Sequence, residues 1–353
     1  MNKPIKQIVQ VVKRFGLCGG MEEYVYQLSK ELKSAGLNIV VLCEQKVSCH
    51  KDNMLEVIEL GSSLRKPRWL SHLIFSKKVK DWINKNPLQG RIIHSHERIS
   101  CHHITTIHST LFNYPPRGFP SFRKFMNEWL ERREITSDSV KVAVPVSHVI
   151  KDQIRSKYPT LGEKNHKPIV PGVDSKLAID FSKVGRRVKT MGFLGQEWKR
   201  KGLAKVLSIW RELRNSGSEI NLVLAGFDEN EAVGIFENEK SEIQLLGWIS
   251  DKLKFYSKID ILVHPAKKEA FGMVITEALF LKIPVVCSTQ CGASMFNKEG
   301  AITALNESAP ISEWVKEVQY LLDNKEANFP QIADWRTIAA QYIKLYESFI
   351  SLN

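Results

Sequence analysis

The residue types best suited to chemistry lie in the segment 264–277. Here an apolar run that is typical of a buried strand gives way to a loop, and Gly272 precedes a helix that we expect to begin near Met273. Glycine allows a ligand to approach the backbone closely. The first amides of a helix, here those of Met273 and Val274, have no partner within the helix and attract anions. The segment therefore predicts an anion site suited to a diphosphate.

Two carboxylates flank this predicted helix start. Glu269 lies in the loop and Glu277 lies about one turn into the helix, so both side chains could line one groove. Carboxylate oxygens in that groove would accept hydrogen bonds from sugar hydroxyls. Glutamates at this spacing also occur by chance on solvated helices, and it is the strand, loop and helix around them that favours a binding site.

A second segment, 192–203, places three cations in a row immediately before another predicted helix. Lys199, Arg200 and Lys201 follow a predicted strand and Gly195. The positive end of a helix dipole disfavours a nearby cation by about 0.3–1 kcal/mol. We therefore favour a bound anion over a solvated basic loop, with Arg200 and Lys201 neutralising a leaving diphosphate as a divalent metal does elsewhere. The chain contains no Asp-x-Asp motif, and we expect no metal and no cofactor.

Polar residues also follow predicted strands in the first half of the chain. Gly19 and Gly20 come after the first strand and open a helix, where their amides can approach a phosphate or a sugar. His108 ends another strand, and His96 and Glu97 follow a third. A histidine at a strand end is often structural, and this alternative remains open for His108.

Short β-branched runs alternate with amphipathic stretches along the whole chain, which predicts an α/β protein with doubly wound parallel sheets. The alternation lapses in a polar, Pro- and Gly-containing stretch at 164–187, the expected linker. We expect two Rossmann-like domains that face a central cleft, because ligands bind at the carboxyl ends of parallel strands. The predicted parts are a first domain, a second domain and a terminal helix that crosses back to the first, at 1–172, 173–330 and 331–353.

Positive charge is confined to the first half of the sequence. The net charge is +13, and residues 1–172 hold 28 Lys and Arg against 15 Asp and Glu, whereas the remainder holds 23 of each. This asymmetry predicts an acidic partner for the first half, either an anionic substrate, a membrane surface or nucleic acid. An apolar stripe with interleaved cations favours a membrane interface, although core packing would also explain it; the stripe comprises Phe119, Phe122, Phe125, Met126 and Trp129.

The sequence also indicates a compartment. The first 16 residues lack the apolar core of a signal peptide, and no apolar run approaches the roughly 20 residues of a membrane span. The six cysteines show no Cys-x-x-Cys pair and are expected to be free thiols. We therefore predict a cytoplasmic protein without a metal site.

The segment 264–277 resembles the donor site of the large retaining glycosyltransferase family four, also called glycosyl transferases group 1. Glu269, Phe271, Gly272 and Glu277 match its E-x-F-G-x-x-x-x-E motif. The resemblance implies that Glu269 contacts the transferred sugar, that Glu277 holds the ribose, and that the amides of Gly272, Met273 and Val274 hold phosphate. It also implies the GT-B fold, transfer with retention and a nucleoside diphosphate sugar as the donor.

Other segments extend this resemblance over most of the chain. Residues 192–203 look like the family's Arg-Lys-Gly phosphate clamp in the form found in lipopolysaccharide-core enzymes, which implies donor contacts for Gly195, Arg200 and Lys201. Thr106-Ile107-His108 is similar to the family's Thr-x-His, whose histidine touches the transferred sugar. Gly19 and Gly20 occupy the place of a Gly-Gly pair that borders the donor diphosphate, although Met21 is larger than the usual residue there.

The charge of the first half and the apolar stripe together favour an anionic glycolipid or oligosaccharide acceptor, reached by peripheral contact with the cytoplasmic face of the inner membrane. His96 and Glu97, which follow a predicted strand, are expected on the acceptor side. Lipopolysaccharide core or another envelope glycan is the expected acceptor class. Two alternatives remain. An epimerase of the same fold would convert a sugar nucleotide without an acceptor, and a basic nucleic-acid-binding protein would explain the charge but not the absence of any recognised nucleic-acid-binding motif.

Overall fold

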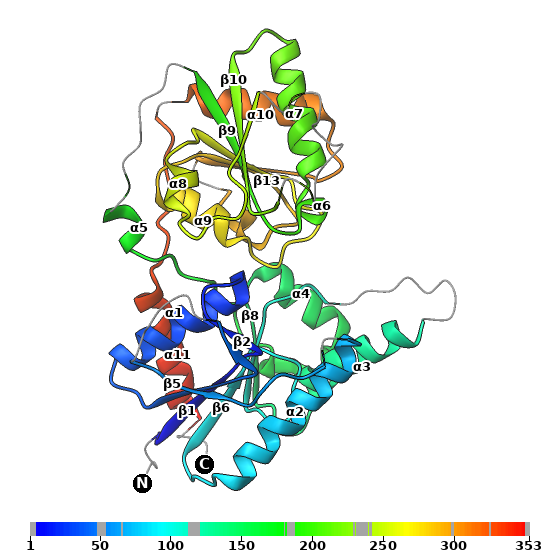
Figure 1. Ribbon diagram of the computed structural model, residues 1–353, viewed down its shortest axis with the longest axis vertical. Helices are drawn as coiled ribbons and strands as arrows, with labels where there is room; N and C mark the ends of the chain where they lie inside the picture. The colour runs from blue at the N-terminus through cyan, green and yellow to red at the C-terminus, as the bar shows by residue number, and fades with distance from the viewer. Residues whose placement is uncertain are drawn as a thin grey trace. The chain divides into compact units, whose positions relative to one another are not determined.

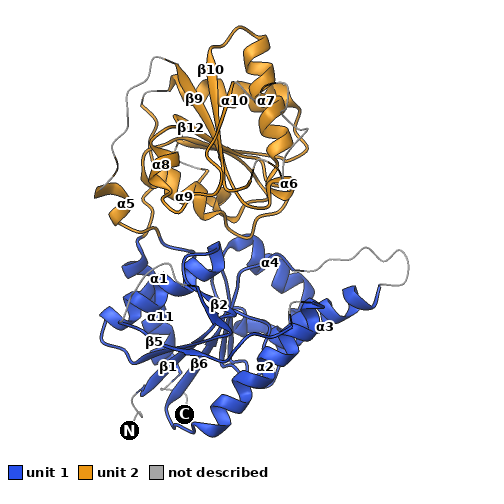
Figure 2. Ribbon diagram, viewed as in Figure 1, with its two compact units in different colours: residues 1–172, 334–353 blue, residues 173–333 orange. Residues whose placement is uncertain are grey.

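The structure is a computed structural model that describes residues 5–47, 54–64, 66–111, 121–179, 181, 188–228, 230, 239, 242–297, 300–324 and 326–349 (Figure 1). The chain divides into two compact units, coloured separately in Figure 2. Unit 1 contains residues 1–172 together with 334–353, and unit 2 contains residues 173–333.

Unit 1 is built on a six-stranded parallel sheet with the strand order β5-β3-β1-β6-β7-β8. Its central strands are apolar and buried on both faces, as expected where helices cover a parallel sheet. The strands are β1 (Gln7–Val11), β3 (Ile39–Cys43), β5 (Glu56–Glu59), β6 (Arg91–Ser95), β7 (Ile104–Ile107) and β8 (Val142–Pro145), and a separate parallel pair is formed by β2 (Arg14–Phe15) and β4 (Gln45–Lys46).

Helices cover both faces of this sheet. In Figure 1, α1 and the terminal helix α11 lie side by side, and α2 contacts α3 elsewhere on the unit. Asp334 caps α11 by accepting a hydrogen bond from the Thr337 amide at 2.8 Å. The helices of unit 1 are α1 (Gly20–Ser34), α2 (Arg68–Lys85), α3 (Phe122–Thr136), α4 (His148–Lys157), a 3₁₀ segment (Pro159–Lys164) and α11 (Trp335–Ser348).

Unit 2 repeats the same design, with the strand order β11-β10-β9-β12-β13-β14 and parallel pairing throughout. The strands are β9 (Lys189–Leu194), β10 (Ile220–Ala225), β11 (Ile243–Leu245), β12 (Ile261–His264), β13 (Val285–Ser288) and β14 (Ile302–Leu305). The helices are α5 (Lys176–Ile179), α6 (Trp198–Lys201), α7 (Leu203–Asn215), α8 (Leu253–Tyr256), α9 (Met273–Phe280), a 3₁₀ segment (Gly292–Phe296) and α10 (Ile311–Asp323).

The core of unit 2 lies between its sheet and the helix pair α7 and α10, which contact each other. Trp210 of α7 and Trp314 of α10 are fully buried there against Phe193 of β9. In both sheets the strand order reverses beside the first strand, between β1 and β6 in unit 1 and between β9 and β12 in unit 2. The prediction of two doubly wound parallel sheets is confirmed, and ligands of such sheets bind at the carboxyl ends of strands beside these reversals.

Candidate functional site

The loops after β9 and β12 carry the polar cluster of unit 2. The β12 loop is held in place by its backbone, because the Glu269 amide donates to the Gln290 carbonyl at 3.1 Å and the Gly292 amide donates to the Glu269 carbonyl at 3.2 Å. Gly272 then adopts a φ of +95°, which glycine tolerates best, and α9 begins at the next residue. The backbone thus fixes both Glu269 and the helix start.

Arg200 and Lys201 of α6 converge on this loop. Their side-chain nitrogens lie 3.4 Å and 3.6 Å from the same oxygen of Glu269, Oε2. The stem of Lys201 packs against Gly195, where any Cβ would collide with it. The structure therefore brings together Gly195, Arg200, Lys201 and Glu269, which the sequence analysis assigned to one site.

A second glycine holds the two loops against each other. Gly202 has a φ of +88°, and a Cβ at this position would collide with the carbonyl of Pro265 in the β12 loop. The Lys267 amide also donates to the Arg200 carbonyl at 2.9 Å. The close contact of the two backbones explains why the cations reach Glu269.

Glu269 is anionic in this setting. Burial by itself raises the pKa of its carboxyl group, but the adjacent His264 imidazole and the charges of Lys201 and Arg200 outweigh burial and hold the pKa at about 2. His264 Nε2 lies 3.8 Å from Glu269 Oε2, too far for a hydrogen bond, and the ring is fully buried against Phe193. The sequence analysis gave His264 no role, since only the folded chain shows its contact with Glu269.

The start of α9 offers free backbone donors. In the part of the chain that the structure describes, the amides of Gly272, Met273 and Val274 donate to no carbonyl group, whereas the Ile275 amide donates to the Gly272 carbonyl at 2.9 Å. Unpaired amides at a helix start, with Arg200 and Lys201 on the neighbouring loop, are suited to hold the oxygens of a diphosphate.

Glu277 has different neighbours from Glu269. It is 2% exposed, and its two oxygens lie 2.7 Å from Lys252 Nζ and 2.6 Å from the Tyr256 hydroxyl. Neither partner was identified from the sequence, because α8 lies more than 20 residues away in the chain. Lys252 and Tyr256 therefore join Glu277 as candidates for the same site.

In unit 1, Gly19 precedes the start of α1 with extended backbone, and Gly20 is the first residue of that helix. A Cβ on Gly19 would collide with the carboxylate of Glu22, which folds back over the turn. Arg14 holds this carboxylate with Nη2 2.6 Å from Glu22 Oε1. The ion pair between Arg14 and Glu22 was not predicted, and it lies directly at the Gly-Gly turn.

His96 and His108 lie side by side at the carboxyl ends of β6 and β7. His96 Nδ1 is 2.8 Å from His108 Nε2, and burial lowers the pKa of His108 to about 3. Glu97 follows His96 in the sequence and is also buried, but its carboxylate contacts other residues. Oε1 accepts a hydrogen bond from the Lys13 backbone amide at 3.1 Å, and Oε2 lies 3.6 Å from His72 Nδ1. Burial raises the pKa of Glu97 to about 7 despite the Lys13 amide.

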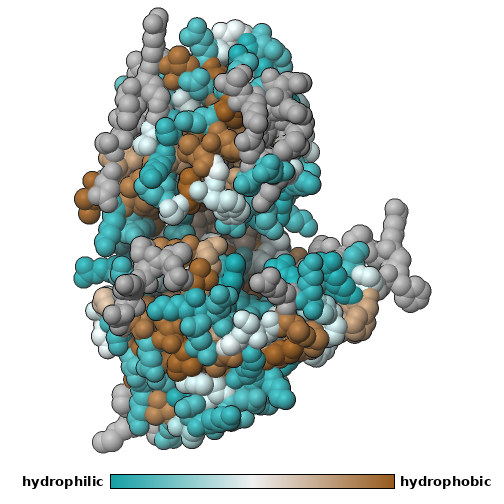
Figure 3. All heavy atoms as spheres, viewed as in Figure 1, coloured by the Kyte–Doolittle hydropathy of each residue, from teal (hydrophilic) through white to brown (hydrophobic). Residues whose placement is uncertain are grey.

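The α3 stripe, defined here as Phe122, Phe125, Met126 and Trp129, is largely exposed to solvent. Phe122, Phe125 and Trp129 are 65%, 54% and 41% exposed, so core packing does not account for these side chains. Trp69 of α2 extends the stripe, with its ring 5.6 Å from that of Phe122. Figure 3 shows apolar side chains gathered among hydrophilic ones on unit 1. Phe119, the remaining predicted member, lies outside the described residues.

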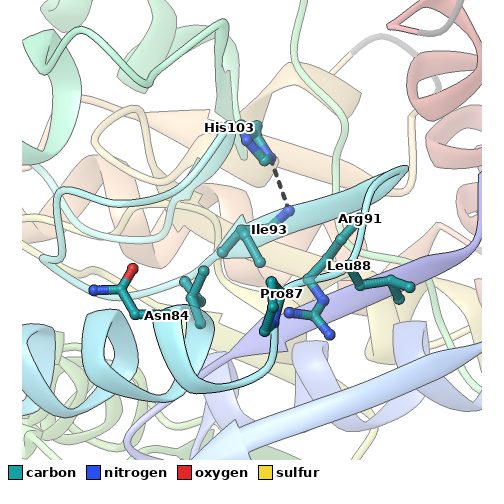
Figure 4. A pocket seen from close by; sticks show the side chains of 7 residues that line it. Asn84, Pro87, Leu88, Arg91, Ile93 and His103 are labelled. Atoms are coloured by element: carbon teal, nitrogen blue, oxygen red, sulfur yellow. Dashed lines mark hydrogen bonds between the residues drawn. The ribbon is translucent and has the colours of Figure 1, made fainter.

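Other possible sites are less informative. A cavity of about 600 Å³ lies near the amino end of β6, where Arg91 and His103 line it (Figure 4), away from the carboxyl ends of the strands. Within the described ranges, no three His, Cys, Asp or Glu side chains are grouped to hold a metal ion. Among the helices described, none is long and apolar enough to cross a membrane.

Both units match known glycosyltransferase families. Residues 18–177 match the model of Glycosyltransferase Family 4, and residues 179–336 match that of Glycosyl transferases group 1. A stretch of 125 residues is 26% identical to the capsular polysaccharide biosynthesis glycosyltransferase CapM of Staphylococcus aureus. That alignment spans 34% of this chain and only 33% of CapM.

Solved structures with the same fold cover nearly the whole chain. WaaG, a glycosyltransferase involved in lipopolysaccharide biosynthesis, aligns with a TM-score of 0.77 at 15% identity, over 98% of this chain and 99% of WaaG. HepE of Anabaena in complex with UDP-glucose aligns with a TM-score of 0.67 at 15% identity, over 98% of each chain. The predicted family and the GT-B fold are confirmed: the chain belongs to the GT-B glycosyltransferases, with a Glycosyltransferase Family 4 domain followed by a Glycosyl transferases group 1 domain.

Proposed function

We propose that the protein transfers a sugar from a nucleoside diphosphate sugar to a hydroxyl group of a glycolipid or oligosaccharide acceptor. The observation that carries this proposal is the convergence of Arg200 and Lys201 on the half-buried Glu269 carboxylate, beside the unpaired amides at the start of α9. Cations and amide donors bind the oxygens of a diphosphate, and a carboxylate accepts hydrogen bonds from sugar hydroxyls. One group of residues in unit 2 offers all three.

The same residues suggest how the donor is activated. The diphosphate oxygens accept hydrogen bonds from the amides of Gly272, Met273 and Val274, while Arg200 and Lys201 neutralise the charge that develops as the sugar leaves. Glu269 remains ionised and accepts a hydrogen bond from a sugar hydroxyl. Because these two cations supply the positive charge, we propose that the reaction needs no divalent metal.

We further propose that transfer retains the configuration of the anomeric carbon. A retaining mechanism through a covalent intermediate needs a carboxylate that is free to attack, but Glu269 is held by two cations and Glu277 by Lys252 and Tyr256. Attack from the same face as the leaving diphosphate fits this arrangement better. The test is the anomeric configuration of the first product formed, read by NMR, and an inverted product contradicts the proposal.

The acceptor class follows from the relatives and the charge. CapM takes part in capsular polysaccharide biosynthesis and WaaG in lipopolysaccharide biosynthesis. The excess positive charge of residues 1–172 suits an anionic acceptor of this kind. We therefore propose an envelope glycan, such as lipopolysaccharide core, as the acceptor, with His108 in contact with the transferred sugar. His96 and Glu97, which we expected on the acceptor side, are buried and already hydrogen-bonded within unit 1, so we propose no direct acceptor contact for their side chains.

Peripheral contact with the cytoplasmic face of the inner membrane completes the proposal. The exposed α3 stripe carries Arg123, Lys124 and Arg132 beside its aromatic rings, and interfacial helices combine these same features. Anionic headgroups attract juxtaposed Lys and Arg by about 1 kcal/mol each. A membrane-bound enzyme would meet a lipid-linked acceptor at the surface where it lies.

A panel of UDP-, GDP- and ADP-sugars, each incubated with the purified chain with and without glycolipid acceptors, tests the function. We expect release of one nucleoside diphosphate to increase when the acceptor is added. Conversion of a sugar nucleotide without an acceptor would instead identify an epimerase. Salt-sensitive binding of nucleic acid, with no sugar nucleotide bound, would favour the nucleic-acid alternative.

A further inference from the structure

A buried chain of hydrogen bonds connects His108 with the terminal helix α11 inside unit 1. It runs through the central strands β1, β6 and β7 and ends on α1 and on a backbone carbonyl near the end of the first family domain. Each neighbouring pair lies within 3.5 Å, in the order His108, His96, Gln10, Tyr346, His94, Thr106, Tyr342, Tyr24 and the Ile169 carbonyl.

The three imidazoles in this chain are neutral. Burial lowers the pKa of His94 and His96 well below the usual range, and that of His108 to about 3. A neutral imidazole has one nitrogen that donates and one that accepts, and each hydroxyl has a single proton to donate. The direction of any one bond in the chain therefore decides the direction of all the others.

Two groups give the direction. The Gln10 side-chain nitrogen donates to Tyr346 at 3.2 Å while its oxygen, which can only accept, lies 2.8 Å from His96 Nε2. At the other end the Tyr24 hydroxyl faces the Ile169 carbonyl, a pure acceptor, at 3.5 Å, and with its proton directed there Tyr24 accepts from Tyr342 at 2.8 Å. The Tyr342 proton is thereby used, and Thr106 donates to Tyr342 at 2.8 Å. Thr106 must then accept from Nε2 of His94, also at 2.8 Å.

The same reasoning continues to the other end of the chain. With its proton on Nε2, His94 accepts at Nδ1 from the Tyr346 hydroxyl at 2.8 Å, and Tyr346 accepts from the Gln10 amide nitrogen at 3.2 Å. The Gln10 oxygen therefore faces His96 Nε2 at 2.8 Å and receives its proton. His96 Nδ1 is left as an acceptor, and it receives the proton of His108 Nε2 at 2.8 Å.

We propose that this chain of hydrogen bonds is a positioning device, which holds His108 in the tautomer protonated at Nε2 so that Nδ1 accepts a hydrogen bond from a hydroxyl group of the bound sugar. The inference rests on the proposed function of the site. Within the described residues, His108 Nδ1 has no hydrogen-bond partner, and the side chain is partly exposed. The positioning residues are Gln10, Tyr24, Tyr342 and Tyr346, and none of them is hydrogen-bonded to His108.

The tautomer also sets a specificity. An unprotonated Nδ1 can accept a proton from a hydroxyl but has none to donate to a carbonyl or a carboxylate. A neutral sugar with a hydroxyl at this point is therefore favoured over a sugar acid with a carboxylate there. The opposite tautomer would reverse this preference.

Two-bond ¹H–¹⁵N spectra of the full chain, labelled with ¹⁵N-histidine, test the tautomer directly. The His108 signals are identified by their loss in His108→Gln. We expect the wild-type protein to carry its His108 proton on Nε2, and a proton on Nδ1 overturns the proposal. This measurement needs no substrate and no variant of the positioning residues.

Tyr342→Phe tests the transmission, since Tyr342 makes no hydrogen bond to His96 or His108. The variant removes the link to Tyr24 and the Ile169 carbonyl, and we expect both tautomers of His108 to appear. Tyr158→Phe is the matched control, because Tyr158 is also buried in unit 1 and hydrogen-bonded, at 2.8 Å to Glu131, but lies outside the chain of bonds. An unchanged His108 spectrum in a folded Tyr342→Phe variant overturns the proposal.

A second readout uses the donor that the panel identifies, together with its monodeoxy analogues. In wild type, we expect the analogue that lacks the contacted hydroxyl to react about fivefold more slowly, the ratio that one net hydrogen bond provides. With the parent donor, Gln10→Met should react more slowly than wild type by about the same factor. With the analogue, Gln10→Met should react at the same rate as wild type. If the rate losses caused by the variant and by the missing hydroxyl multiply, the two act independently, and the proposal is contradicted. Absence of turnover with every donor refutes the proposed function instead, and the spectrum still decides the tautomer.

Discussion

Replacing Lys201 by alanine removes one of the two cations that converge on Glu269. Lys201 is suited to such a test because its nitrogen lies 3.6 Å from Glu269 Oε2 and its side chain is only 18% exposed. Its stem also packs on Gly195, so the charge is held at a fixed place before a ligand arrives. A fixed charge needs no reorganisation when the leaving group develops its own charge.

The size of the effect follows from this geometry. At 3.6 Å and an effective dielectric constant of about 20, two unit charges interact by about 4–5 kcal/mol. Water that enters the vacated space and the remaining Arg200 recover part of this energy. Loss of one fixed donor typically lowers kcat by about 10²–10³, or about 3–4 kcal/mol, and we expect Lys201→Ala to fall in this range. The loss should appear mainly in kcat, because the charge develops in the transition state.

The assay is release of nucleoside diphosphate in the presence of acceptor, with slow donor hydrolysis as a substitute where no acceptor is at hand. Lys199→Ala is the control, because Lys199 lies on the same short helix with its nitrogen 5.0 Å from the Trp198 ring centre and away from Glu269. Turnover by Lys201→Ala within about twofold of wild type, or an equal loss in Lys199→Ala, would refute the reasoning.

Three further predictions concern other parts of the chain. Because the pKa of Glu97 rises from 4.5 to about 7, the folded state keeps a proton that the unfolded chain loses between these pH values, and stability falls as the pH rises through this window. Glu97→Gln should therefore have a higher free energy of unfolding than wild type at pH 8, by up to about 3 kcal/mol, but not at pH 4. An equal gain in stability at both pH values in denaturant unfolding would contradict this. Gly202→Ala, forced to a φ of +88° against Pro265, should lose about 1–3 kcal/mol of stability in denaturant unfolding together with donor affinity, and wild-type values of both would contradict it. Phe125→Ser should weaken sedimentation with anionic vesicles, whereas Tyr320→Ser, equally exposed on the charge-balanced unit 2, should not; equal binding by both variants would count against the membrane proposal.

The parallel sheets and the cluster around Glu269 could be predicted because their signals are local. A buried apolar run followed by a loop, a glycine and a helix is written in consecutive residues, and α9 begins at Met273 as expected. The cations of α6 stand out for the same reason, because three of them are consecutive. The structure places them in the last turn of this short helix, where a cation is not disfavoured, so the penalty expected from a helix start was wrong. Local patterns of this kind can be recognised in the sequence without knowledge of the tertiary fold.

Side-chain contacts between residues that are far apart in the sequence show no such local pattern. Tyr256 of α8 and Lys252, which directly precedes that helix, reach Glu277, and His264 reaches Glu269 across its own loop. Each contact exists only after the strands have assembled. Tyr342 appeared in the sequence only as part of an amphipathic helix, although its hydroxyl is hydrogen-bonded to Thr106 of β7 and Tyr24 of α1, both more than 200 positions away.

Three short strands were missed for a different reason. β14 is a partly buried edge strand of four residues, and β2 and β4 contain two residues each. Such segments bury little apolar surface and show no clear alternation of polar and apolar residues, so their pairing depends on the strands already present.

The central claim is that side-chain cations, together with the amides at the start of α9, hold a diphosphate in unit 2. Titration calorimetry of UDP, GDP and ADP into the full chain, with excess EDTA present, tests it most directly. The account predicts that one of them binds without a divalent ion, that its affinity falls as salt is raised, and that Lys201→Ala weakens it while Lys199→Ala does not. Binding that requires a divalent ion, or that is equal in the two variants, would contradict it.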